Sequence, residues 1–242
     1  EYLFCIDIVT AGIAVGLLLA IKVQPQARVD LQAKGYFDDL RAGLAYVREN
    51  KPIRSLFTYF AFTFFLVAPI AFLSPLLVAR TYGEEVWRLT ANEITFFGGS
   101  ILGGILMTAW GGFSNRFRTL AVTTLVWAAL MTVLGLSSSF IMYLVFMTLV
   151  GMPMPFFNAS AVTLLQELAA PEMHGRVFGV QGLIINSVMP LGMLVFGPIA
   201  DVVRIETLLV ISGALMALPG LWLFFNRHAV PAAPEYEMQP GD

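Results

Sequence analysis

The chain has 242 residues, of which 58% are hydrophobic and only 12% are charged, and its net charge is −2. A soluble domain carries about 25% charged residues, so this composition excludes a disordered chain, a nucleic-acid-binding module and an ordinary cytosolic enzyme. One cysteine and two histidines exclude a disulfide framework and a clustered metal site, and we expect neither metal nor cofactor. The composition predicts an all-α, polytopic membrane protein that is not an enzyme.

Seven stretches are long and apolar enough to cross a bilayer, which takes about 20 residues each. They lie at roughly 2–21, 53–79, 94–113, 120–137, 140–168, 177–200 and 205–225. We therefore divide the chain into a first membrane helix at 1–21, a loop at 22–52 and a six-helix bundle at 53–226. A tail at 227–242, which contains three prolines and two glutamates, is expected to be disordered.

The positive charges predict the orientation of the spans. Lysine and arginine concentrate in cytoplasmic loops. With the N-terminus outside, only Arg80, Arg88 and Arg204 fall in outward loops, and the remaining Lys and Arg of the fourteen face inward. The C-terminus is therefore expected in the cytoplasm.

The loop at 22–52 contains an expected amphipathic helix. Phe37, Leu40, Leu44 and Val47 recur at helical spacing, and charged residues separate them. This helix is either a linker packed under the bundle or an element that couples two halves of a larger protein.

Three inward-facing stretches resemble the major facilitator superfamily, and specifically its macrolide-efflux and enterobactin-exporter type of drug and siderophore exporter. The first is FDDLRAGLAYVR at 37–48 followed by KPIR at 51–54, which is similar to the central loop of that branch. The second, WGGFSNRFR at 110–118, resembles a short superfamily loop in which aspartate stands where this chain has Asn115. The third is QELAAPEMHGRVFG at 166–179, similar to the loop between the tenth and eleventh helices.

The resemblance implies that the chain is helix six, the central loop and helices seven to twelve of a twelve-helix transporter. It implies a secondary transporter that exports small amphipathic compounds by proton antiport and alternating access. Its partners would be a small-molecule substrate, the proton, the lipid bilayer and a missing N-terminal half, with no nucleic acid. The location would be the bacterial plasma (inner) membrane. The start at Glu1 rather than methionine fits a truncated transporter.

Two inward loops carry candidate gating residues. They are Gly111, Asn115, Arg116, Arg118, Glu172 and Arg176. Arg116 and Arg118 either close the cytoplasmic side in one state or only fix the topology. Arg176 is expected to pair with Glu172 or Glu167, as a conformational latch or as a surface ion pair.

Aromatic and amide side chains within the spans are candidates for a substrate cavity. They are Phe60, Phe64, Asn158, Gln181 and Asn186. The phenylalanines either stack on an amphipathic substrate or face lipid. The amides either contact substrate beside Pro153 and Pro155 or bond neighbouring helices.

Asp7 is the acidic residue placed well inside an expected span and is the candidate for proton coupling. Glu93 and Glu167, at the expected ends of spans, are weaker candidates. Small residues at Ser100, Gly104, Thr108 and Gly112 recur every four positions and predict a helix-packing seam, to which Gly99 and Gly103 add an adjacent face.

A seven-helix ligand-sensing receptor is the alternative function. A retinal protein is excluded because the last span has no lysine for the Schiff base. A membrane-embedded enzyme lacks a carboxylate–histidine cluster in the sequence. Substrate identity, coupling ion, direction of transport and oligomeric state do not follow from these residues.

Overall fold

The structure, a computed structural model, describes residues 10–13, 15–17 and 36–225. The chain divides after Phe37 into two units. In the first unit, residues 10–13 and 15–17 are helical, and most of the expected first span lies outside the described residues, as does the expected tail.

From residue 36 to 225 the described chain is helical, with short connections. The elements are α2 (Tyr36–Glu49), α3 (Lys51–Thr81), α4 (Val86–Trp110), α5 (Arg116–Leu134), α6 (Phe140–Gly151), α7 (Pro153–Leu168), the 3-10 turn η1 (Pro171–Met173), α8 (His174–Val202) and α9 (Ile205–Phe225). Six helical segments are long and apolar enough to span a membrane, with α6 and α7 together forming one of them. The described chain thus has the six spans expected at 53–226.

Local sequence explains where several helices begin and end. Asn50, Asn115 and Ser139 each accept, on a side-chain oxygen, a hydrogen bond from an N–H of the following first turn, at α3, α5 and α6. α4 ends at Gly111, whose φ of 74° is left-handed and suits glycine. The span at 140–168 breaks at Met152 because Pro153 begins α7 and has no N–H to continue the α6 ladder.

The helices pack in pairs that bury mainly α3, α5 and α7. α5 packs against α7 and α9, α3 against α8 and α9, and α4 against α6 and α7. In the most apolar stretch of α3, half of the residues are buried. In the corresponding stretches of α4 and α8 only 11% are buried, so α4 and α8 present apolar faces that no described element covers.

Glycines let the helices of the α4–α6–α7 group approach closely. A Cβ on Gly99 would overlap the carbonyl of Thr148, one on Gly103 the carbonyl of Met152, and one on Gly151 the carbonyl of Phe96. Gly104 has nothing within 4 Å of where a Cβ would lie. The expected seam therefore runs along the Gly99–Gly103 face, and the row containing Gly104 was the wrong face of the helix.

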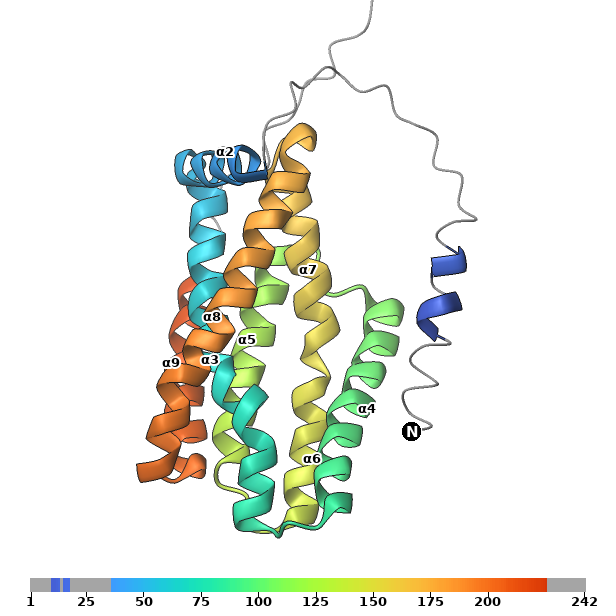
Figure 1. Ribbon diagram of the computed structural model, residues 1–242, viewed down its shortest axis with the longest axis vertical. Helices are drawn as coiled ribbons and strands as arrows, with labels where there is room; N and C mark the ends of the chain where they lie inside the picture. The colour runs from blue at the N-terminus through green and yellow to red at the C-terminus, as the bar shows by residue number, and fades with distance from the viewer. Residues whose placement is uncertain (1–9, 14, 18–35, 226–242) are drawn as a thin grey trace, which may run out of the picture. The chain divides into compact units, whose positions relative to one another are not determined.

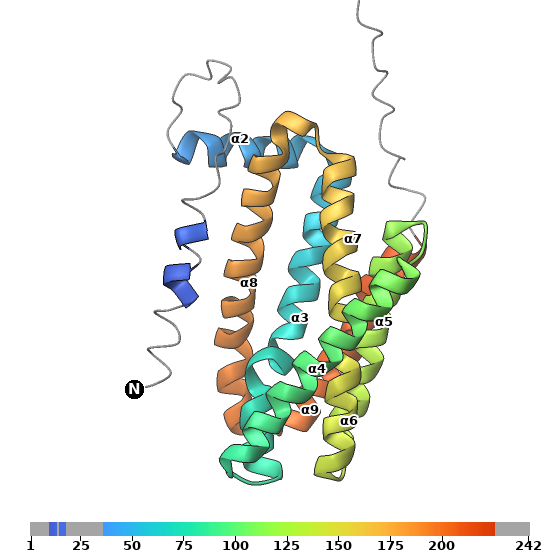
Figure 2. The ribbon, with the colours of Figure 1, turned by 90° about the vertical axis from the view of Figure 1, so that its right-hand side faces the viewer.

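The expected amphipathic helix is α2, which lies across the end of the bundle where α7 and α8 meet (Figures 1 and 2). The Ala170 N–H donates to Tyr46 Oη at 3.1 Å. Arg176 Nε and Nη2 donate to Asp39 Oδ1 at 3.2 and 2.8 Å. α2 is thus bound to the loop between α7 and α8.

Candidate functional site

A cavity of about 340 Å³ lies among α3 to α8, and we call it the central cavity. Phenylalanines and methionines dominate its wall: Phe64, Phe96, Phe97, Phe157, Met131, Met147, Met154 and Met189. Its volume lies at the lower end of the range for small-molecule sites, which are mostly apolar with a few placed polar groups.

The wall is ordered by contacts on the side where α5 and α7 pack. Trp127 Nε1 donates to the Val150 carbonyl at 2.8 Å, and the Trp127 ring lies 5.2 Å from that of Phe157. The Phe64 ring meets Phe157 edge-on at 5.8 Å. These rings are fixed against one another, which favours a preformed apolar surface.

Two of the five predicted cavity residues, Phe64 and Asn158, line the central cavity. Phe60 is fully buried behind it, with its ring 5.8 Å from Phe157 and 6.4 Å from Phe64, so it supports the wall. Gln181 and Asn186 lie outside the lining, and the Asn186 amide donates to the Gly182 carbonyl on its own helix at 2.8 Å. From α8, the lining residue is Met189.

Glu93 contributes the one charged side chain to the described lining of the central cavity. Its Oε1 accepts a hydrogen bond from Asn92 Nδ2 at 3.0 Å, and Asn92 Oδ1 accepts from Tyr143 Oη at 2.7 Å. Asn92 and Tyr143 are fully buried and Glu93 is exposed, so this network holds one carboxylate oxygen of an otherwise accessible side chain.

Sequence reasoning gave Glu93 little weight because the span was expected to begin at residue 94. α4 begins at Val86, which places Glu93 two turns inside the helix. Arg88 in the first turn lowered the apparent hydropathy there, but its charge is satisfied by Glu85 at 2.9 Å. The apolar residues Leu89 and Val86 continue the helical pattern before residue 94, and they could have indicated this earlier start.

The first predicted gating loop forms its contacts within itself. Asn115 Oδ1 accepts from the Arg118 N–H at 3.3 Å, Arg116 Nη1 donates to the Gly111 carbonyl at 2.9 Å, and the Arg118 guanidinium lies 4.5 Å from the centre of the Phe113 ring. These contacts brace the turn between α4 and α5. Its role as a gate stays a prediction.

In the second predicted gating loop, Arg176 pairs with Asp39 of α2. The expected pairing with Glu172 or Glu167 is wrong: among the described residues the ion pair of Arg176 is with Asp39, while Glu172 lies in η1 and is exposed. The pair joins elements far apart in sequence, which loop spacing could not reveal. The proton-coupling candidate Asp7 lies outside the described residues.

Comparison with known proteins identifies the family. The model of the Major Facilitator Superfamily matches residues 56–239. Macrolide efflux protein A of Streptococcus pyogenes is 27% identical over 218 residues, covering 88% of this chain and 54% of the relative. The protein of that name from Enterococcus faecalis is 27% identical, covering 79% and 60%, and the multidrug efflux pump Tap of Mycolicibacterium fortuitum is 28% identical, covering 60% and 34%.

The chain spans about half the length of the macrolide efflux protein of Streptococcus pyogenes. The match begins within α3 and extends through α9, and it contains the six described spans except the first residues of α3, together with the second and third loop motifs. It favours a transporter family over the seven-helix receptor. The chain, a multi-pass membrane protein, belongs to the Major Facilitator Superfamily.

Proposed function

We propose that the chain is the C-terminal half of a secondary transporter that exports small amphipathic compounds, with drugs such as macrolides as the first candidates and siderophores as the second. The observation that carries the proposal is the central cavity, whose apolar wall contains the Glu93 carboxylate and the Asn158 amide. The names of the relatives support the drug class.

The chemistry of the cavity fits an amphipathic molecule with a basic group. Phenylalanine and methionine side chains adapt to irregular apolar shapes. The Glu93 carboxylate, held by Asn92, would pair with an amine, and Asn158 offers both a donor and an acceptor. No bond is made or broken in such a site.

Transport by alternating access requires a second half. Only 11% of the residues in the most apolar stretches of α4 and α8 are buried. We propose that the N-terminal half covers part of these two helices. The two halves would then rock about the cavity and open it to each side in turn. Coupling would be proton antiport, for which Glu93 joins Asp7 as a candidate. The membrane would be the bacterial inner membrane, with the C-terminus in the cytoplasm.

The experiment measures accumulation of a labelled macrolide in inverted membrane vesicles that contain the whole transporter, with and without a protonophore. We expect energised accumulation that the protonophore abolishes. Glu93→Gln keeps the hydrogen bond from Asn92 but removes the charge, and we expect it to lower accumulation about tenfold, as for the loss of a charge-assisted contact.

Glu84→Gln is the matched control, since Glu84 is an exposed acid in the connection between α3 and α4 and does not line the cavity. It should leave accumulation unchanged. Accumulation that is insensitive to both the protonophore and Glu93→Gln would show that neither proton coupling nor this cavity operates in export.

A further inference from the structure

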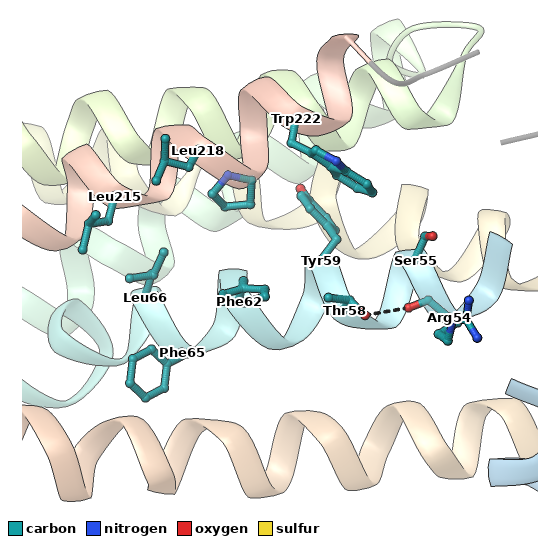
Figure 3. A pocket seen from close by; sticks show the side chains of 11 residues that line it. Arg54, Ser55, Thr58, Tyr59, Phe62, Phe65, Leu66, Leu215, Leu218 and Trp222 are labelled. Atoms are coloured by element: carbon teal, nitrogen blue, oxygen red, sulfur yellow. Dashed lines mark hydrogen bonds between the residues drawn. The ribbon is translucent and has the colours of Figure 1, made fainter. Parts of the chain in front are cut away.

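A second hollow, the side groove, lies between the first half of α3 and the last part of α9 and has a volume of about 670 Å³ (Figure 3). Its lining shares no residue with the central cavity. The described structure therefore has an apolar groove on the flank of the bundle that the proposed transport site does not use.

The groove is polar at one end and apolar at the other. Arg54, Ser55 and Thr58 lie at the start of α3, and Phe62 and Leu66 follow one to two turns deeper, facing Leu215 and Leu218 of α9. Figure 3 shows Arg54 at one end of the row and Leu66 with Leu215 at the other. With α3 entering from the cytoplasm, as proposed above, the polar end lies at the cytoplasmic interface.

The charge of Arg54 is not neutralised within the described part of the chain. No carboxylate there forms an ion pair with it, and its Nη1 donates to the Arg48 carbonyl at 3.0 Å. The Thr58 hydroxyl donates to the Arg54 carbonyl at 2.9 Å. The groove therefore presents a guanidinium beside the Ser55 hydroxyl, and its described lining contains no acidic side chain.

We propose that the side groove binds an anionic phospholipid of the cytoplasmic leaflet. Its phosphate would contact Arg54 and Ser55, and one acyl chain would lie between Phe62 and Leu218. Basic pockets between membrane helices on the cytoplasmic side suit anionic head groups, and the bilayer supplies such lipids at high local concentration. The cation at the mouth disfavours an amine-bearing drug. The inference rests on the proposed orientation and not on transport.

The experiment is native mass spectrometry of the purified chain in detergent, with dioleoyl-phosphatidylglycerol or dioleoyl-phosphatidylcholine added at equal concentration. We expect the chain to retain the anionic lipid preferentially. Arg54→Gln should lower retention of phosphatidylglycerol about fivefold, because one Arg at a membrane surface contributes about that much.

Two further variants complete the test. Arg48→Gln removes an exposed charge at the same junction but does not line the groove, and it should leave retention within twofold. Leu218→Trp fills the apolar end and should lower retention of both lipids, since Leu218 is 62% exposed and tolerates a larger ring. Equal loss in the two arginine variants, or equal retention of the two lipids, would overturn the proposal. Because no transport is measured, a failed export assay leaves this result intact.

Discussion

Asn115 occupies the position before the first turn of α5, where its Oδ1 accepts the Arg118 N–H at 3.3 Å. The superfamily pattern has aspartate here, and both residues can cap a helix. Replacing aspartate with asparagine keeps this hydrogen bond and removes a negative charge. The loop is therefore held by capping and by Arg116, which bonds the Gly111 carbonyl, and its fold does not depend on an ion pair.

The capping role predicts opposite results for two substitutions. Asn115→Ala removes the side-chain cap and leaves the Arg118 N–H only its bond to the Asn115 carbonyl at 3.0 Å, so it should lower the free energy of unfolding by about 1 kcal/mol. Asn115→Asp retains the cap and places a negative charge at the helix N-terminus, so it should be neutral or slightly stabilising. Thermal unfolding of the purified protein measures both, and equal loss in the two variants would contradict the role.

For single residues, the sequence predicted some of the side chains that line the cavity but not which side chains contact one another. Phe64 was placed in a cavity because its ring can stack on an amphipathic substrate, and Asn158 because an amide within a span faces the bundle interior; both line the central cavity. The place of Glu93 in the cavity lining and the partner of Arg176 did not follow from the sequence, because both depend on tertiary structure: on the packing of α4 in one case and on the docking of α2 in the other.

Among the elements, α4 shows most clearly how close packing depends on single glycines. It contacts α6 and α7 through Gly99 and Gly103, whereas Gly104 faces open space. Small residues occur on two adjacent faces of this helix, and periodicity alone could not say which face meets a neighbour. The answer comes from the partner, since Gly151 of α6 lies opposite and admits the α4 backbone.

This contact predicts that a glycine-to-alanine change lowers the free energy of unfolding at position 99 but not at position 104. Gly99→Ala should lower the free energy of unfolding by about 1 to 3 kcal/mol, because the new methyl group meets the Thr148 carbonyl. Gly104→Ala should be neutral or stabilising by up to about 1 kcal/mol, since alanine is the better helix former. Thermal unfolding of the two variants measures this difference. If Gly104→Ala destabilised the protein as much as Gly99→Ala, the assignment of the packed face of α4 would be refuted.

The span boundaries show where hydropathy succeeds as a guide and where it does not. The start of α9 at Ile205 agrees with the expected start of the last span, because the polar Arg204 precedes a largely apolar stretch. The span at 140–168 is two helices, since Pro153 interrupts the ladder without lowering hydropathy. α4 extends eight residues further toward its N-terminus than expected, through a segment in which Arg88 is neutralised locally.

For the whole molecule, the asymmetry of lysine and arginine predicts which side of the membrane each loop occupies. Ser114, between α4 and α5, and Ser138, between α5 and α6, are both exposed and lie at opposite ends of α5. In a background without other cysteines, Ser138→Cys should react with an impermeant maleimide in intact cells. Ser114→Cys should react only after the cells are opened. The reverse pattern would invert the proposed topology.

The fold class and the six described spans could be predicted because a bilayer imposes length and composition on each helix. The arrangement of the helices could not, since within lipid it depends on shape and on a few polar contacts. The faces of α4 and α8 illustrate this: both helices have the composition of ordinary spans, and only their low burial in the described chain distinguishes them from the other spans.

The attachment of α2 to the first turn of α8, through Arg176 and Asp39, has a mechanical consequence. With 29 residues, α8 is about 44 Å long, so this attachment lies roughly 20 Å from the middle of the helix. A tilt of about 10° about that midpoint would carry α2 sideways by about 3 to 4 Å. A tilt of α8 would therefore displace α2 with it, because the Arg176–Asp39 pair joins α2 to the N-terminal end of α8.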